Sequence, residues 1–171
     1  MLESMYDRDL IAPMWRELEE IGVRPLETPE AIDEAMKQTE GTMLILVNSV
    51  CGCAAGSARP GVALALQNDL IPDRLYTVFA GVDRAATERA RFHMGDVPPS
   101  SPSVALFKDG ELAFMIPRRF IEGRTEGEVA EMLIEAFDTH CTRKGPSVPR
   151  EKMLQAFATS SARCSSELKA R

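Results

Sequence analysis

The segment 42–49, "TMLILVNS", constrains the fold more than any other part of the sequence. Its central residues are all apolar, so hydrophobicity does not alternate along it. A continuous apolar run of this length is typical of a central β-strand that is covered on both faces. Residues 54–68 then predict a helix that is interrupted by Pro60. Two cysteines, Cys51 and Cys53, therefore lie where a buried strand gives way to a helix.

The rest of the chain alternates between helix and strand patterns. Thr28 is predicted to cap a helix, Pro13 to kink or delay one, and Asp109-Gly110 to turn a β-hairpin over 103–116. The expected helices cover 7–21, 28–39, 83–94 and 125–141, and further strands cover 23–27 and 74–81. From residue 42 onward, the order β-α-β-α-β-β-α predicts a three-layer α/β/α sandwich with a central mixed β-sheet.

Composition suggests one domain with an appendage. The chain has 171 residues, of which 44% are hydrophobic and 27% charged, as expected for a globular protein with its own core. Residues 142–171 contain seven Lys or Arg against two Glu, a local charge of +5 in a chain whose net charge is -6. We therefore expect a domain over 1–141 and a basic C-terminal appendage over 142–171, partly helical or disordered, that adds little to the core.

The net charge of the chain and its N-terminal segment argue against some classes of binding partner and location. A net charge of -6 argues against nucleic-acid binding, because a polyanion is bound by concentrated positive charge. The first residues, "MLESMYDRDLIAPMW", carry acids and lack the basic and apolar regions of a secretory signal. Apolar runs stay well short of the roughly 18 residues of a membrane span. We expect a cytoplasmic protein that binds neither nucleic acid nor membrane.

The pair Cys51 and Cys53 has three possible interpretations. A zinc site needs about four ligands, and among the other candidates (Cys141, Cys164, His93 and His140) the one compact pair is His140-Cys141. Two buried structural thiols are also possible, because cysteine is among the most buried residue types. A redox pair fits the surroundings best. A thiolate next to the first turn of a helix is stabilised by unpaired N–H groups and by the helix dipole.

Neighbouring residues favour the redox interpretation. Gly52 is expected because a residue without Cβ best tolerates a disulfide closed across one residue. Ala54 and the small residues after it should keep the rim of the site open to a substrate. The segment "PPSSPSV" places Ser101 and Pro102 just before a strand. It is either a surface turn or a loop with a cis Ser101–Pro102 bond that lies against the dithiol, shapes a substrate groove and blocks metal capture.

Several segments together resemble the bacilliredoxin family of bacteria: "NSVCGCAAGSARPG", "TVFAG", "PPSSPSVALFKDGEL", "IPRRFIEG" and "AFDTHC". The resemblance covers nearly all of residues 4–141 and implies a thioredoxin-like fold with a CGC active site. It implies removal of a low-molecular-weight thiol, bacillithiol, from S-thiolated client proteins, with some disulfide isomerase or reductase activity. Cys51 would be the nucleophile and Cys53 the resolving cysteine. Bacillithiol, or another low-molecular-weight thiol, would be a co-substrate, and no tightly bound cofactor or metal is implied.

Other residues have weaker claims to the site. Arg118 and Arg119 could attract an acidic small thiol, although arginines after a strand are more often simply solvated. His93 and His140 are expected at the surface or at a helix end. The alternative function is a non-catalytic module whose CGC pair holds a metal or docks a partner.

Overall fold

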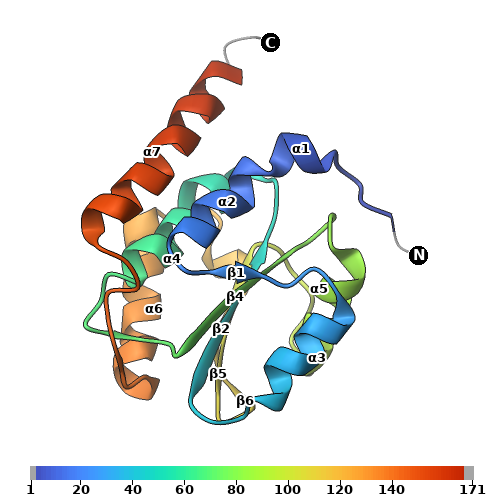
Figure 1. Cartoon of the computed structure of the whole chain (residues 1–171), viewed down its shortest axis with the longest axis vertical. Coiled ribbons are helices and arrows are strands. Elements are labelled where there is room, and N and C mark those ends of the chain that lie inside the picture. The colour runs from blue at the N-terminus through green and yellow to red at the C-terminus, as the bar shows by residue number, and fades with distance from the viewer. Residues whose placement is uncertain (1–2, 168–171) are drawn as a thin grey trace.

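The computed structural model describes residues 3–167, with side chains through residue 158. A five-stranded sheet lies between two layers of helices (Figure 1). The strands follow the order β1-β4-β2-β5-β6, with bounds Arg24–Pro25, Arg74–Phe79, Thr42–Asn48, Ser103–Lys108 and Glu111–Ile116. The first three run parallel, and β5 and β6 run antiparallel to their neighbours. The predicted thioredoxin-like α/β/α sandwich with a mixed sheet is confirmed.

Strand β2 is the centre of the sheet, as its apolar run predicted. It pairs with β4 on one side and β5 on the other, and all of its residues are buried. Leu44 and Leu46 belong to one core cluster, whereas Met43, Ile45 and Val47 belong to the cluster on the other face. A strand that is covered on both faces gains from apolar residues at every position, which explains the absence of alternation.

The two helix layers follow from these two cores. One face of the sheet is covered by α2 (Pro13–Glu20), α4 (Arg59–Ala65) and α6 (Glu126–His140), and the other by α3 (Pro29–Lys37) and α5 (Arg84–His93) (Figure 1). A short helix, α1 (Arg8–Ile11), precedes α2, and the break falls at Ala12, just before Pro13. Thr28 caps α3 as predicted, because its hydroxyl accepts a hydrogen bond from the Ala31 N–H.

Two local features follow directly from residue chemistry. The hairpin turn between β5 and β6 has positive φ angles at Asp109 (50°) and Gly110 (85°), as a two-residue hairpin turn requires. The expected helix over 54–68 begins with a π-helical segment, η1 (Ala54–Ala58), before α4. Pro60 donates no backbone hydrogen bond and crowds the preceding turn, which is consistent with a wider turn before it.

The C-terminal segment is more closely attached than its composition predicted. Strand β7 (Arg143–Lys144) pairs with β3 (Leu70–Ile71), and α7 (Arg150–Glu167) packs against α2. Met153 and Ala156 of α7 are buried in the same core as α4 and α6. The expectation that residues 142–171 add little to the core is therefore wrong for the first half of α7, because its apolar residues recur at helical spacing. The domain boundary at residue 141 stays a prediction.

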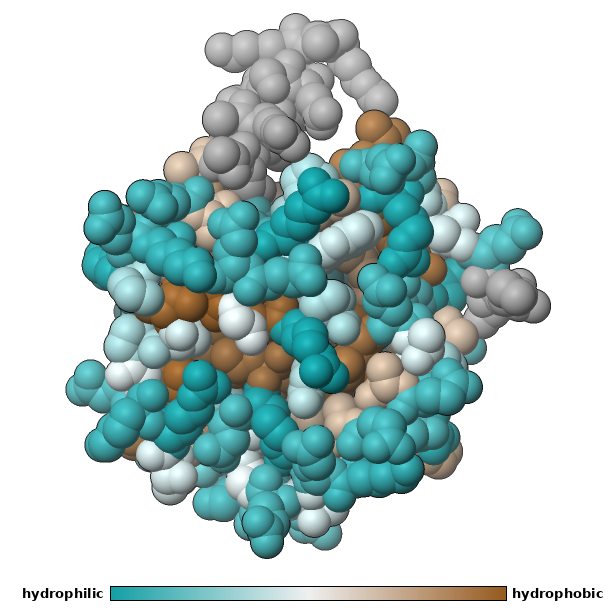
Figure 2. Space-filling view, in the orientation of Figure 1, coloured by the Kyte–Doolittle hydropathy of each residue, from teal (hydrophilic) through white to brown (hydrophobic). Residues whose placement is uncertain are grey.

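The surface in the orientation of Figure 1 is mostly hydrophilic. Hydrophobic residues that show on this face gather near its centre, around the edge strand β1 (Figure 2). Among helices of the described part of the chain, none is both long and apolar enough to cross a membrane.

Candidate active site at the end of strand β2

The cysteine pair lies in the turn that joins β2 to the following helix. The carbonyl of Cys51 accepts hydrogen bonds from the backbone N–H groups of Ala54 (3.1 Å) and Ala55 (3.2 Å), so Cys51 directly precedes the first helical turn. Cys51 and Cys53 are free thiols, and each is half-buried. The junction of strand and helix therefore presents two thiols at one end of the sheet.

Cys51 has an environment that favours its thiolate. Burial raises its pKa, but hydrogen bonds from the Ser49 hydroxyl, the Ala54 N–H and Cys53 outweigh burial and hold the pKa below the ordinary value of a thiol. The Ser49 Oγ lies 3.0 Å from the Cys51 Sγ. Because the thiolate is the nucleophile in disulfide exchange, Cys51 is suited to make the first attack.

Cys53 has the opposite environment. Burial raises its pKa, and the negative charge of Cys51 raises it further, while the Arg118 guanidinium partly counters both. The Arg118 Nη2 lies 3.9 Å from the Cys53 Sγ. The charge of Cys51 is also the largest cause of a raised pKa of Arg118. The two thiols are thus electrostatically linked, and only one of them favours the thiolate.

A buried polar network lies beneath the Cys51 turn, and the sequence analysis missed it. The Arg59 guanidinium is paired with Glu17 from α2 at 2.5 Å, and both side chains are almost fully buried. The same guanidinium donates to the Asn48 Oδ1 (3.0 Å) and to the Ser49 carbonyl (3.1 Å). Asn48 Oδ1 also accepts the Ser49 N–H at 2.9 Å. The network therefore fixes the backbone of the residue whose hydroxyl contacts Cys51.

The loop before β5 has the backbone conformation of the second of its two interpretations, whereas the expected position of Pro102 against the dithiol stays a prediction. The Ser101–Pro102 peptide bond is cis, as that interpretation predicted, and Pro102 is buried. Arg118 is the first residue of a short 3-10 helix, η2 (Arg118–Phe120), and joins this loop to the cysteines. Its Nη1 donates to the Ser101 carbonyl at 3.2 Å, and its Nη2 reaches Cys53.

A groove of about 350 Å³ opens beside Cys51. Cys51 lines it, and Cys53 is not among the lining residues. The groove is formed where β2 and β4 end, together with the N-terminal segment, α5, the cis-proline loop and η2. Its polar lining includes Tyr6, Ser49, Arg91, Ser101 and Arg118. The volume is at the small end of the range for small-molecule sites. Cys51 therefore borders a space of small-molecule size.

Of three further predicted site residues, Ala54 lies differently from expectation, whereas the role of Gly52 in closing a disulfide stays a prediction. Gly52 is exposed, and a Cβ added to it would meet nothing within 4 Å, so crowding does not require glycine in this dithiol form. Ala54 is fully buried and supports Cys51 through its backbone rather than lining the rim. Arg119 is exposed, and its guanidinium lies over the Phe120 ring.

His93, His140 and Cys141 lie outside the groove lining. His93 contacts Asp33 of α3, and His140 is the last residue of α6. Cys141 is buried, and burial raises its pKa. The side chain of Cys164 lies outside those described. No group of three or more His, Cys, Asp or Glu side chains within the described residues is arranged to hold a metal ion.

Comparison with known proteins identifies relatives over most of the chain. Residues 6–141 match the protein family described as disulphide isomerase. A bacilliredoxin of Salinibacter ruber is 48% identical over 143 residues, which are 82% of this chain and 84% of that protein. Bacilliredoxins of Koribacter versatilis and Halalkalibacterium halodurans are 46% and 48% identical, over 80% of this chain and 94% of each relative.

These descriptions agree with the chemistry of the site. A family described as disulphide isomerase, together with relatives named bacilliredoxin, supports a thiol–disulfide oxidoreductase-type function. The matched residues 6–141 include the strand β2, the Cys-Gly-Cys turn and the cis-proline loop. Because identity at this level spans the whole sandwich and its dithiol, the chain belongs to the bacilliredoxin family.

Proposed function

We propose that this protein removes a low-molecular-weight thiol of the bacillithiol type from mixed disulfides on client proteins. The observation that carries the proposal is the opposite environment of the two thiols. Cys51 favours its thiolate and lines a groove of small-molecule size, whereas the pKa of Cys53 is raised by burial and by the charge of Cys51. Such a pair supplies one thiol whose nucleophilic thiolate is favoured and a second thiol whose protonated form is favoured until the first has reacted.

The first step is an exchange of disulfide bonds. The Cys51 thiolate attacks the sulfur of the small thiol in the client mixed disulfide. A bond forms between that sulfur and Cys51, the bond to the client breaks, and the client leaves as a thiolate that takes up a proton. The client is thereby reduced, and the small thiol is held on Cys51.

The second step uses Cys53. Once Cys51 is in a mixed disulfide it carries no charge, so one of the causes that raise the pKa of Cys53 disappears. Cys53 then loses its proton more readily, attacks the Cys51 sulfur and expels the small thiol. The resulting Cys51–Cys53 disulfide is reduced by further low-molecular-weight thiol. Disulfide isomerase or reductase activity would use the same two residues.

The two cysteines are expected to fail differently when replaced. Cys51→Ser abolishes release of the small thiol, because a serine hydroxyl is not ionised at neutral pH. Cys53→Ala still attacks once and then accumulates with the small thiol on Cys51, which intact mass measures directly. Cys141→Ala is a matched control, because this buried thiol lies outside the groove lining and its removal leaves release unchanged.

Two results would contradict this assignment. Activity retained by Cys51→Ser, with the first attack lost in Cys53→Ala, would reverse the roles. Equal and complete loss in both, with tight stoichiometric zinc binding by the unmodified chain, would favour the alternative of a non-catalytic metal-binding module. Clients loaded with bacillithiol and with glutathione, compared side by side, identify the preferred small thiol.

A further inference from the structure

Two arginines from different elements face the groove beside Cys51. Arg91 comes from α5 and Arg118 from η2, and both belong to the groove lining. The chain as a whole carries a net charge of -6, so a groove with two guanidinium groups has the opposite sign to the molecule. Arg118 has a carboxylate nearby, since Glu122 lies 3.4 Å from its Nη2. Arg91, by contrast, forms no ion pair with a carboxylate among the described residues.

Arg91 is a half-buried cation whose contacts within the described residues are incomplete. Its Nη2 donates to the Ser100 carbonyl at 3.3 Å, and its Nε is buried without a hydrogen-bond partner. Burial lowers the pKa of Arg91, and the charge of Glu88 only partly counters this. The arginines that form ion pairs within the described part of the chain are others: Arg8, Arg59, Arg89, Arg118 and Arg124.

Arg89, on the same helix, is an example of a guanidinium that is paired with a carboxylate. Its Nε lies 2.6 Å from the Asp33 carboxylate, and its guanidinium also covers the Phe92 ring at 4.8 Å. Arg89 is not part of the groove lining. Arg89 and Arg91 therefore differ: Arg89 contacts its counter-ion, whereas Arg91 contacts none among the residues that the structure describes.

We infer that Arg91, together with Arg118, forms an anion subsite that binds a carboxylate of the small thiol while its sulfur is bonded to Cys51. This inference rests on the proposed function and deepens it. The groove then selects acidic low-molecular-weight thiols over neutral or cationic ones. A guanidinium without a counter-ion gains most from a carboxylate, because charge-assisted hydrogen bonds are the stronger kind and partial burial limits screening.

The chemistry of exchange explains why the occupant is the small thiol rather than the client. After the first step the small thiol is bonded to the Cys51 sulfur, and Cys51 lines the groove. The client has by then left as a free thiol. A space of about 350 Å³ accommodates a small molecule but not a folded chain. The anion subsite therefore contributes both to recognition of the mixed disulfide and to holding the intermediate.

The test compares probes that differ in charge. A client protein with a single cysteine is loaded separately with mercaptosuccinate, 2-mercaptoethanol or cysteamine, and release of each thiol by the full chain is timed. The unmodified protein is expected to release mercaptosuccinate fastest and cysteamine slowest. Arg91→Gln is expected to lower the ratio of the mercaptosuccinate rate to the 2-mercaptoethanol rate by about tenfold, as expected for loss of one charged hydrogen bond. Arg91→Lys restores part of that ratio.

Arg89→Gln is the matched control, because it removes the same charge from the same helix outside the groove. It is expected to leave the ratio unchanged. The inference is overturned if Arg91→Gln slows release of all three probes equally, or if Arg89→Gln changes the ratio as much as Arg91→Gln does. A protein that releases the three probes at equal rates also overturns it while leaving the proposed function intact. Release of none of them refutes both.

Discussion

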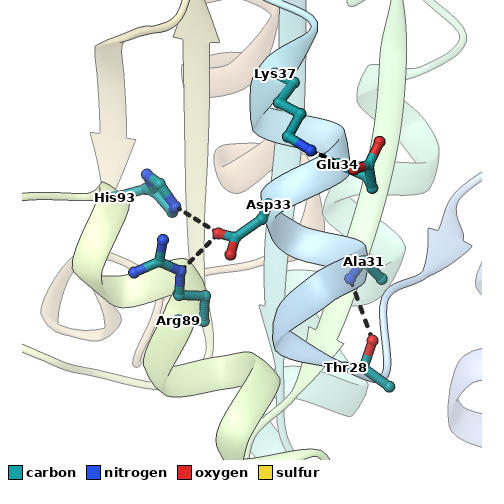
Figure 3. A network of polar contacts seen from close by, with 7 residues as sticks. All are labelled: Thr28, Ala31, Asp33, Glu34, Lys37, Arg89 and His93. Carbon is teal, nitrogen blue, oxygen red and sulfur yellow. Dashed lines mark hydrogen bonds and ion pairs between the residues drawn. The ribbon is translucent and has the colours of Figure 1, made fainter.

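Two polar networks in this protein are built from the same kinds of group in different surroundings. Beneath the Cys51 turn, Glu17 pairs with Arg59 at 2.5 Å. On the surface between α3 and α5, Asp33 pairs with Arg89 at 2.6 Å and also contacts His93 (Figure 3). The side chains of the first pair are 2% and 3% exposed, whereas Arg89 and Asp33 are 36% and 40% exposed. The nitrogen–oxygen distances of the two pairs are nearly the same, and the pairs differ in how deeply they are buried.

The difference in burial gives the two networks different roles. Water can replace either partner of the surface pair, so this ion pair does little to fix the positions of neighbouring residues. The hydrogen bond from Arg89 lowers the pKa of Asp33, and this effect is confined to the two side chains and their immediate neighbours. Water cannot replace a partner of Glu17, whose second oxygen, Oε2, is already buried without a hydrogen-bond partner within the described residues. The buried network therefore holds one arrangement, and the Cys51 turn is attached to it.

Breaking the buried pair should have the largest effect. Arg59→Met leaves the Glu17 carboxylate buried without its partner, and we expect the free energy of unfolding to fall by about 3–5 kcal/mol. Urea unfolding measures the change. Arg59→Met combined with Glu17→Leu removes both charges and should recover most of the loss. A loss below about 1 kcal/mol for Arg59→Met alone would place the buried pair in the same class as the surface pair.

Removing the link between this network and the thiol should have an intermediate effect. Ser49→Ala deletes a hydrogen bond to Cys51, so the thiolate loses stabilisation and the pKa of Cys51 rises. The pH profile of Cys51 alkylation by iodoacetamide therefore moves to higher pH, and the rate at pH 7 falls by about tenfold, the effect of one hydrogen bond to a charged atom. Ser57→Ala is the control, because the Ser57 hydroxyl donates to the Arg124 carbonyl instead. If the pH profile of Cys51 alkylation does not move, the Ser49 hydroxyl and the network behind it do not influence the reactivity of Cys51.

Removing the surface pair should have the smallest effect. Asp33→Asn deletes the carboxylate shared by Arg89 and His93, and we expect a change in unfolding free energy close to the limit of detection. Any loss should vanish in 1 M salt, because exposed charges are screened. A salt-independent loss comparable with that of Arg59→Met would remove the distinction between the two networks.

Local chemistry was enough to predict the fold and the position of the dithiol. The apolar run of β2, the cap at Thr28 and the turn at Asp109-Gly110 depend on residues that are neighbours in sequence. The cis bond before Pro102 was one of two interpretations of its loop, and the structure decided between them. The family resemblance carried the roles of the two cysteines, which stay predictions.

The groups that surround the dithiol were decided by tertiary structure. Glu17 and Arg59 are 42 positions apart and meet only because α2 and α4 cover the same face of the sheet. Arg118 reaches Cys53 across 65 positions, and Arg91 enters the groove because α5 follows the neighbouring strand β4. Periodicity, caps and turns report contacts within a few residues, where chain geometry sets the distances. Contacts between distant segments depend on the order and direction of the strands, so Arg91 and the Glu17–Arg59 pair, unlike Arg118, could be assigned to the site only once the sheet is assembled.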